Sequence, residues 1–407
     1  MGARNDELLA RYQRSVMGVF GLPPLVLDHG AGCYVWDVDG NRYLDLVGGI
    51  AVNALGHGHP ALVTAVSKQA AEGIHISNLF TSEPQIALAE RLIDLAGAPE
   101  GSAVFFCNSG TEAVEAAIKL SRRTGRTGLV AAEGAFHGRT TGALALTHKP
   151  AYREPFEPLI PGVRHVPYGD EAALRDAVTD ETAAVVLEPI QGEAGVLSPG
   201  TAYLRTAREV TQEHGALLIL DEIQTGIGRT GTWFAFQQAG IVPDAVTVAK
   251  GLGGGVPVGG LIAFGDHNAH LLTAGQHGTT FGGNPLAAAA SLAVLDAIES
   301  EGLLEHAEVA GAHLAEAVMA LGHPIVTGVR GVGLLRAITL AREVAPQLAV
   351  AAREAGFIVN PVAPAAIRLA PPLVVSLEQL DSFVEALPAL LDACLSDIPD
   401  DRPEDPR

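Results

Sequence analysis

An acid and a lysine follow two apolar runs in the middle of the chain. Residues 216–220 (ALLIL) lead into Asp221, and residues 245–249 (AVTVA) lead into Lys250 and a glycine-rich stretch. Short, continuously apolar runs bounded by turn residues are typical of strands buried on both faces. Because the carboxyl ends of such strands line the ligand crevice of an open α/β sheet, we expect the two side chains to share a crevice. The pair suits pyridoxal phosphate (PLP), which needs a lysine for its aldehyde and an acid for its ring nitrogen.

A second candidate site lies upstream, where residues 103–119 (AVFFCNSGTEAVEAAIK) have the pattern of a strand, a tight turn and a helix. The first turn of a helix presents free backbone N–H groups and a partial positive charge. Ser109, Gly110 and Thr111 would add hydroxyls and close backbone approach, which indicates a phosphate site. The alternative is an ordinary capping box between Ser109 and Glu112. The residues alone leave both interpretations open.

Apolar runs alternate with helical segments from about residue 101 to residue 264. The expected strands are 103–107, 128–132, 183–187, 216–220, 245–249 and 261–264, and the clearest helices between them are 112–123 and 203–214. This alternation predicts βαβ units and a mostly parallel sheet, hence an α/β fold.

The flanking regions have a different pattern. Before the alternating region we expect a hairpin within 32–46 and helices at 4–15, 61–72 and 83–95; after it we expect helices at 285–300, 303–321, 344–355 and 377–395, and strands at 332–340, 356–359 and 366–369. The mixture after residue 310 predicts a smaller α+β domain. The polar, proline-rich residues 396–407 are predicted to be disordered.

The composition limits the function classes. The 407 residues carry a net charge of −20, which argues against nucleic acid or an anionic membrane as a partner. The three cysteines are widely spaced, without CxxC or HExxH, which predicts a reducing compartment and no metal site. The start of the chain lacks an apolar signal core, and no apolar run is long enough to span a membrane. We therefore expect a cytoplasmic protein.

Six motifs together resemble the class III (ornithine-type) aminotransferases, which are PLP enzymes of fold type I. They are NSGTEAVE from Asn108, FHGRT from Phe136, EPIQGEAG from Glu188, LDEIQTGIGRTG from Leu220, TVAKGLGGG from Thr247 and HGTTFGGNPL from His277. The likeness extends from about residue 23 to residue 391. It implies a large PLP-binding domain (56–310) with a mostly parallel seven-stranded sheet, and a small α+β domain formed by 311–395 with a contribution from 1–55.

The resemblance also implies how the cofactor is held. Lys250 matches the lysine that forms the Schiff base, and Asp221 matches the acid that keeps the ring nitrogen protonated. Phe136 would stack on the ring, Gln224 would bind its phenolic oxygen, and residues 109–111 would hold its phosphate. The alternatives are a solvated lysine or aspartate at a strand end, a core phenylalanine and a surface glutamine.

The same resemblance assigns substrate contacts. Arg139 matches the arginine that binds a substrate carboxylate, for which the guanidinium fork is suited. Glu193 and Arg368 match a switch pair. When an amine donor is bound, Arg368 stays paired with Glu193. The second carboxylate of 2-oxoglutarate, in contrast, displaces Glu193 and binds Arg368. The alternatives are a surface salt bridge for Arg139 and a structural ion pair for the other two.

Two neighbouring threonines imply a homodimer. Thr280 matches a residue that reaches the PLP phosphate from the neighbouring subunit, and Thr279 matches a substrate contact. Each active site would then need two chains. The alternative is that both hydroxyls only cap the helix that follows Pro285.

Within the class, the chain most resembles the acetylornithine aminotransferases, in GGIAVNALGHGHP from Gly48 and IRLAPPL from Ile367. Enzymes that act on free ornithine carry a tyrosine near the position of Gly21, and its absence leaves room for an N-acylated substrate. The resemblance implies transfer of the δ-amino group of N2-acetylornithine to 2-oxoglutarate, in arginine biosynthesis. Alternatives are ornithine, succinylornithine, a lysine-pathway amine or 4-aminobutyrate as donor, a mutase or decarboxylase, and a non-catalytic PLP-fold protein, which should have lost Lys250 or Asp221.

Overall fold

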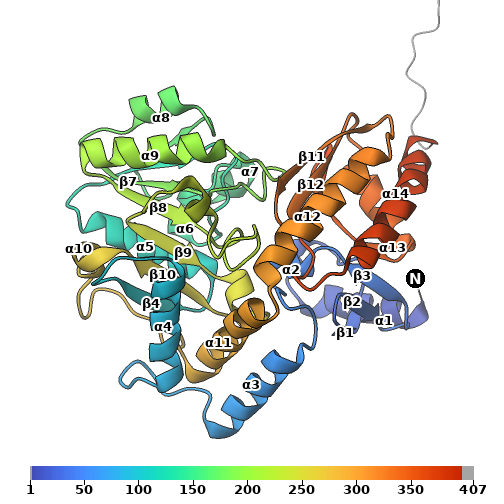
Figure 1. Ribbon diagram of the computed structural model, residues 1–407, viewed down its shortest axis with the longest axis horizontal. Helices are drawn as coiled ribbons and strands as arrows, with labels where there is room; N and C mark the ends of the chain where they lie inside the picture. The colour runs from blue at the N-terminus through green and yellow to red at the C-terminus, as the bar shows by residue number, and fades with distance from the viewer. Residues whose placement is uncertain (1, 397–407) are drawn as a thin grey trace, which may run out of the picture.

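A seven-stranded sheet lies at the centre of the larger part of the molecule (Figure 1). The computed structural model describes residues 2–396, so the predicted disordered tail lies, apart from Ser396, outside the described residues. The strands are β4 (Ala103–Cys107), β10 (Gly259–Ala263), β9 (Ala245–Val248), β8 (Leu217–Asp221), β7 (Thr182–Leu187), β5 (Gly128–Ala132) and β6 (Val163–Val166), in spatial order. Only β10 runs antiparallel to its neighbours. The mostly parallel seven-stranded sheet is therefore confirmed, although the apolar runs had indicated six strands and had missed β6.

Helices cover both faces of this sheet because its strands are apolar on both sides. Along β8, Leu218 and Leu220 belong to one buried cluster, and Leu217 and Ile219 belong to another, as alternating strand side chains require. Helices α5 (Gly110–Arg122) and α6 (Thr141–Leu146) pack on one face; α8 (Glu171–Ala177) and α9 (Gly200–His214) pack on the other. This packing fixes β8 beside β9, with Asp221 in register with Thr247.

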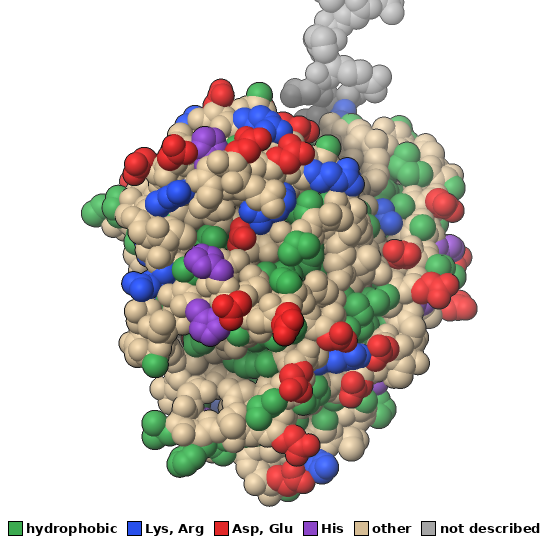
Figure 2. All heavy atoms as spheres, turned by 60° about the vertical axis from the view of Figure 1, so that its left-hand side comes forward, with side chains coloured by type: hydrophobic (Ala, Val, Ile, Leu, Met, Phe, Trp, Pro, Cys, Tyr) green, Lys and Arg blue, Asp and Glu red, His purple; other side chains and the backbone are tan. Residues whose placement is uncertain are grey.

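The remaining helices of this part lie around the sheet or connect it to the rest of the chain (Figure 1). They are α3 (Pro60–Glu72), α4 (Glu83–Leu95), α7 (Pro150–Arg153), α10 (Gly265–Ala269), α11 (Pro285–Ser300), and the short 3-10 helices η2 (Glu154–Phe156), η3 (Ala235–Ala239) and η4 (Lys250–Gly253). None of the described helices is both long and apolar enough to cross a lipid bilayer. Figure 2 shows acidic side chains spread over one face of the molecule, as expected from the net charge of −20.

Two four-stranded sheets and four longer helices form the other part of the molecule. One sheet contains β1 (Leu27–Ala31), β2 (Tyr34–Asp37), β3 (Arg42–Asp45) and β13 (Phe357–Ile358); the other contains β11 (Val326–Val332), β12 (Leu335–Leu340), β15 (Ala366–Leu369) and β14 (Asn360–Ala363). The helices are α1 (Ala3–Ser15), α12 (Leu303–Ala320), α13 (Ala345–Glu354) and α14 (Leu377–Ser396), with the short η1 (Gly18–Phe20) and α2 (Gly48–Ala51) nearby in sequence. Because β3 pairs with β13, the two ends of the chain share a sheet.

The expectation of a single strand at 332–340 is wrong. The structure has two antiparallel strands, β11 and β12, in place of one. The chain turns at Gly333, whose φ of +57° lies in the left-handed region that favours glycine. The apolar pattern continues through the turn, which is why periodicity alone did not locate it. The strand β1 was likewise not expected from its sequence, whose residues are mostly exposed.

Candidate active site

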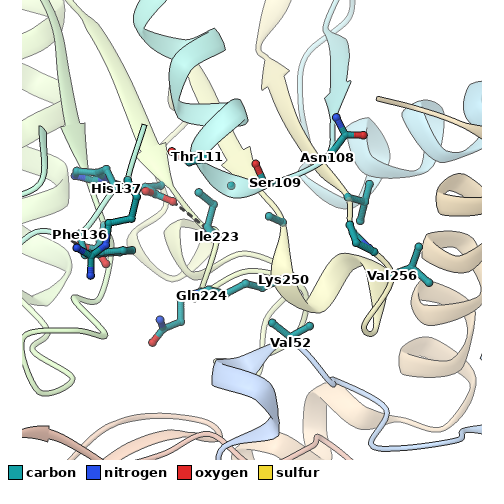
Figure 3. Close-up of a pocket in the computed structure, with 18 of the residues that line it drawn as sticks. Val52, Asn108, Ser109, Thr111, Phe136, His137, Ile223, Gln224, Lys250 and Val256 are labelled. Carbon is teal, nitrogen blue, oxygen red and sulfur yellow. Dashed lines mark hydrogen bonds and ion pairs between the residues drawn. The ribbon is translucent and has the colours of Figure 1, made fainter. Parts of the chain in front are cut away.

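A cavity of about 430 Å³ lies at the carboxyl ends of the central strands (Figure 3). Its walls come from the loops after β4, β5, β7, β8 and β9, as expected for an open α/β sheet. Eight of the residues predicted from the sequence line it: Ser109, Gly110, Thr111, Phe136, Arg139, Asp221, Gln224 and Lys250. The fold therefore brings together segments that are more than 100 residues apart.

Asp221 is a buried carboxylate with a histidine partner. It is 3% exposed, its Oδ2 lies 2.7 Å from Nδ1 of His137, and Thr247 donates its hydroxyl to Oδ1 at 3.1 Å. Burial lowers the pKa of His137, but the hydrogen bond and the negative charge of Asp221 outweigh it and the pKa lies above its usual value. The protonated form of His137 is therefore favoured beside Asp221. The alternative of a solvated aspartate at a strand end is wrong.

Lys250 stands two residues beyond β9, where the chain changes direction. Its φ of +44° lies in a backbone region that residues other than glycine rarely adopt. Lys250 is also the first residue of the 3-10 helix η4. Burial first, and then the positive charge of Arg368, lower the pKa of its amine to about 8, although Glu193 and Asp221 act in the opposite direction. An amine with this pKa can act as nucleophile and as proton acceptor near neutral pH.

The turn before α5 is both a helix cap and a set of free donors. The backbone N–H of Glu112 donates to Oγ of Ser109 at 3.3 Å, so the capping interaction is present. The backbone N–H groups of Gly110 and Thr111, however, form no hydrogen bond within residues 2–396, and both residues line the cavity. A Cβ at Gly110 would lie 2.7 Å from Cδ1 of Ile223. This helix terminus fits an anion such as a phosphate.

Two further residues of the cavity wall were not assigned from the sequence. His137 was regarded only as a neighbour of Phe136, and Glu188 was noted only as part of a motif. The backbone N–H of Phe136 donates to Oε2 of Glu188 at 3.0 Å, and burial raises the pKa of Glu188 to about 7. Glu188 directly follows β7 as Asp221 ends β8, so the same strand-end rule could have found it. Nothing in the sequence indicates the contact between His137 and Asp221.

Arg368 is buried beside the cavity, and both of its terminal nitrogens form hydrogen bonds. It is 2% exposed, and its Nη1 lies 2.5 Å from Oε1 of Glu193. Nη1 also donates to Oε1 of Gln224 at 3.2 Å, and Nη2 donates to Oδ1 of Asn360 at 2.9 Å. Gln224 is buried too, so the alternative of a surface glutamine is wrong. The predicted pair of Glu193 and Arg368 is thus in contact and connects through Gln224 to the cavity.

Arg139 differs from Arg368 in its exposure and in the groups that its guanidinium contacts. It is exposed, and no carboxylate of residues 2–396 lies within ion-pair distance of its guanidinium, so the predicted alternative of a surface salt bridge is not found there. Its Cζ lies over two aromatic rings, 3.6 Å from the centroid of Tyr152 and 5.6 Å from that of Phe136.

Thr279 and Thr280 do not line the cavity. The hydroxyl of Thr279 accepts hydrogen bonds from Asn108 at 3.1 Å and from the backbone N–H of Gly282 at 3.2 Å, and Thr280 is exposed. The helix α11 is capped by Asn284, whose Oδ1 accepts from Ala287. The alternative in which the threonines cap this helix is therefore wrong.

A family model described as aminotransferase class III matches residues 19–391. The chain belongs to the class III aminotransferase family. It is 57% identical to the acetylornithine aminotransferase of Mycobacterium tuberculosis, over 94% of this chain and 95% of that one. Among solved structures, it superposes on the ornithine aminotransferase of Toxoplasma gondii with a TM-score of 0.91 at 29% identity, covering 97% and 96% of the two chains. The acetylornithine aminotransferase of Elizabethkingia anophelis gives 0.85 at 34% identity, covering 96% and 100%.

Class III aminotransferases use PLP, and the residues of this cavity fit that cofactor. The free N–H groups at the start of α5 suit its phosphate, and the buried carboxyl group of Asp221 suits a protonated ring nitrogen. Lys250 supplies an amine of lowered pKa, and Phe136 supplies an aromatic face on the wall of the cavity. In this class III aminotransferase, all residues predicted to contact the cofactor line the cavity except Thr280.

Proposed function

We propose that this aminotransferase transfers the δ-amino group of N2-acetylornithine to 2-oxoglutarate, giving N-acetylglutamate 5-semialdehyde and glutamate in arginine biosynthesis. The observation that carries the proposal is the difference between two arginines near Lys250. Arg139 has no acidic partner in the described chain, and Arg368 is paired with Glu193. Similarity to acetylornithine aminotransferases at 55–57% identity supports the choice of donor.

Four residues are proposed to hold the cofactor and to move the proton. PLP supplies an electron sink for the carbon that loses its proton. Asp221, which is buried and hydrogen-bonded to His137, holds the ring nitrogen in its protonated form. Phe136 orients the ring, and Lys250 first anchors the cofactor and then, as a neutral amine, carries the proton at its Nζ.

The two substrates are proposed to share one pocket by changing the partner of Arg368. The α-carboxylate of acetylornithine binds Arg139, whose fork is free to bind it in a bidentate way. This donor brings no second carboxylate, so Glu193 stays on Arg368 and neutralises it. 2-Oxoglutarate brings two carboxylates, and the second replaces Glu193. A buried guanidinium needs a negative partner in both states, and the exchange provides one.

A half-reaction screen tests the choice of donor. The PLP form of the enzyme is mixed separately with acetylornithine, ornithine, succinylornithine and 4-aminobutyrate, and the loss of the visible absorption of the lysine-bound cofactor is followed. We expect acetylornithine to react fastest, because Gly21 stands near the position where enzymes that act on free ornithine carry a tyrosine. A clear preference for free ornithine, succinylornithine or 4-aminobutyrate would contradict the proposal.

We also propose that the enzyme is a homodimer in which Thr280 completes the partner's phosphate site. The exposure of Thr280, outside the cavity of its own chain, supports this. The test mixes Lys250→Ala chains with Thr280→Ala chains under conditions that exchange subunits. If Thr280 acts across the interface, mixed dimers regain one intact site and bind PLP tightly again. If it acts within its own chain, mixing restores nothing.

Two further proposals concern the chain as a whole. The proposed domain division keeps the predicted bounds, with 1–55 and 311–395 in the small domain and 56–310 in the large one, except that the whole of α12 (Leu303–Ala320) belongs to the small domain; the pairing of β3 with β13 supports the division. Limited proteolysis with mass spectrometry tests these bounds. A cytoplasmic location is proposed from the cysteine usage, and cell fractionation tests it.

A further inference from the structure

Arg139 has an unusual environment for a residue that is to bind a substrate anion. Its side chain is exposed, and in the part of the chain that the structure describes its charged end contacts aromatic rings and no acid. An exposed arginine without an ion pair can adopt many rotamers, and most of them would turn its guanidinium away from the cavity. Something must therefore select its orientation.

The ring of Tyr152 makes the closest of these contacts. With Cζ 3.6 Å from the ring centroid, the guanidinium cannot stand edge-on, because an edge-on nitrogen would approach the ring to roughly 2.3 Å given a C–N bond of about 1.33 Å. The guanidinium therefore lies flat on the ring. Its N–H groups point outward in its own plane, so stacking holds the arginine without using the donors that a carboxylate needs.

Tyr152 is itself held in place by its neighbours. It lies in α7, which begins at Pro150, and its backbone N–H donates to the carbonyl of Lys149 at 3.0 Å. Its ring meets that of Phe136 edge-on, with centroids 6.4 Å apart and planes at 84°. The hydroxyl of Tyr152 forms no hydrogen bond with any described residue, so its aromatic face, and not its polar end, makes the contacts.

We propose that Tyr152 is a positioning residue that orients Arg139 at the rim of the cavity, toward the carboxylate of the amine donor. The inference rests on the proposed role of Arg139 in binding that carboxylate. The ring acts on substrate affinity through the arginine and contacts no reacting atom. It also ties the arginine to Phe136, so that the carboxylate site and the wall against which the cofactor ring stacks are aligned by one side chain.

The test compares three substitutions in the PLP-loaded enzyme. Tyr152→Phe keeps the aromatic face, Tyr152→Leu removes it, and Tyr152→Met removes it at closer to the original length, should the leucine variant fold poorly. Phe156→Leu is the matched control, because Phe156 is an exposed aromatic residue of the same segment and no cation of residues 2–396 lies over its ring. Two quantities are measured: KM and kcat with acetylornithine, and the Kd of N2-acetylnorvaline, which lacks the reacting amine and so reports binding alone.

We expect Tyr152→Leu and Tyr152→Met to raise both KM and Kd by about 3- to 10-fold, with kcat changed less than about twofold. Tyr152→Phe and Phe156→Leu should stay within about twofold of the wild type. In an Arg139→Leu background, removing the ring should change nothing further. The inference is overturned if Tyr152→Phe is as harmful as Tyr152→Leu, if neither aliphatic variant weakens binding, or if the effects add in the double variant.

Failure of the underlying function looks different from failure of this inference. If Arg139→Leu alone leaves the Kd of N2-acetylnorvaline unchanged, the proposed role of Arg139 is wrong. If the wild type does not bind that compound at all, the proposed donor is wrong. If Arg139→Leu weakens binding and the aliphatic variants at Tyr152 do not, only the positioning role is lost.

Discussion

The two arginines near Lys250 show two ways of preparing a cation for a substrate. Arg368 is buried, and three polar side chains hold its guanidinium, among them the carboxylate of Glu193. Arg139 is exposed and rests on aromatic rings, without an acid in the described chain. A substrate carboxylate can bind Arg139 directly, but it must replace Glu193 to bind Arg368.

Under the proposed function, this difference gives each arginine its own selectivity. Arg139 can serve both substrates, since each has a carboxylate remote from its reacting carbon. Arg368 can discriminate between them, because leaving Glu193 is favourable only when a second carboxylate takes its place. Arg368 also lies close enough to lower the pKa of Lys250, whereas Arg139 makes no such contribution. The following predictions separate the two roles.

The largest effect is expected from removing the group that both half-reactions need. Lys250→Ala should slow the half-reactions with acetylornithine and with 2-oxoglutarate alike, by at least about 10³-fold, because it removes the amine that carries the proton. Rapid-mixing absorbance in both directions measures this. The protein should also lack the visible absorption of the lysine-bound cofactor. Full turnover by this variant would contradict the account.

Arg368→Leu should have the next largest effect, and an unequal one. Losing one partner of a buried charge pair costs about 2–5 kcal/mol, so the half-reaction with 2-oxoglutarate should fall by about 30-fold or more. The half-reaction with acetylornithine should fall less than about tenfold, because that substrate does not bind Arg368. Single-turnover rates in each direction are the measurement, and equal losses in both would remove the distinction between the arginines.

Arg139→Leu should weaken both substrates through binding. Hydrogen bonds to a charged group contribute about 1.5–3 kcal/mol, so KM should rise by about 10- to 100-fold for acetylornithine and for 2-oxoglutarate. The limiting rates should change less, since the residue lies at the rim. Steady-state kinetics with each substrate varied in turn measures the split. An increase confined to one substrate would show that the carboxylate site is not shared.

The smallest effect concerns the pH dependence of cofactor attachment to the apoenzyme. The pKa of Lys250 is lowered to about 8, so its amine is mostly protonated below that pH and mostly neutral above it. Only the neutral amine is nucleophilic, so the rate of attachment should rise with pH and level off above about 8. Arg368→Leu should move the midpoint upward, because it removes a positive charge that disfavours the ammonium form. Arg139→Leu should leave the midpoint in place, which makes it the control.

The sequence predicts the positions of groups that follow buried strands and misses contacts that form across the fold. Asp221 and Lys250 could be placed because apolar runs lead into them, and the turn before α5 was recognisable from its small polar residues. The pair formed by His137 and Asp221 joins residues 84 positions apart, and no local pattern encodes it. Tyr152 escaped notice for the same reason.

Two structural features also depended on tertiary context. The short strand β6 carries Arg164 and His165 in place of an apolar run, and it is stabilised by pairing with β5. Glu222, for which the sequence suggested no role, accepts hydrogen bonds from the backbone N–H of Phe236 at 2.8 Å and from the hydroxyl of Thr225. It therefore fastens the loop that follows Asp221.

The exchange of partners at Arg368 is tested most directly by Glu193→Gln. This variant keeps a hydrogen-bond acceptor beside Arg368 but removes the charge that neutralises it. The measurement is the ratio of the two single-turnover rates by which the PLP form accepts an amino group, from glutamate and from acetylornithine. We predict that the ratio of glutamate to acetylornithine rises by about tenfold, because Arg368 is left free for a second carboxylate. An unchanged ratio, with both rates falling together, would mean that Glu193 and Arg368 form only a structural ion pair.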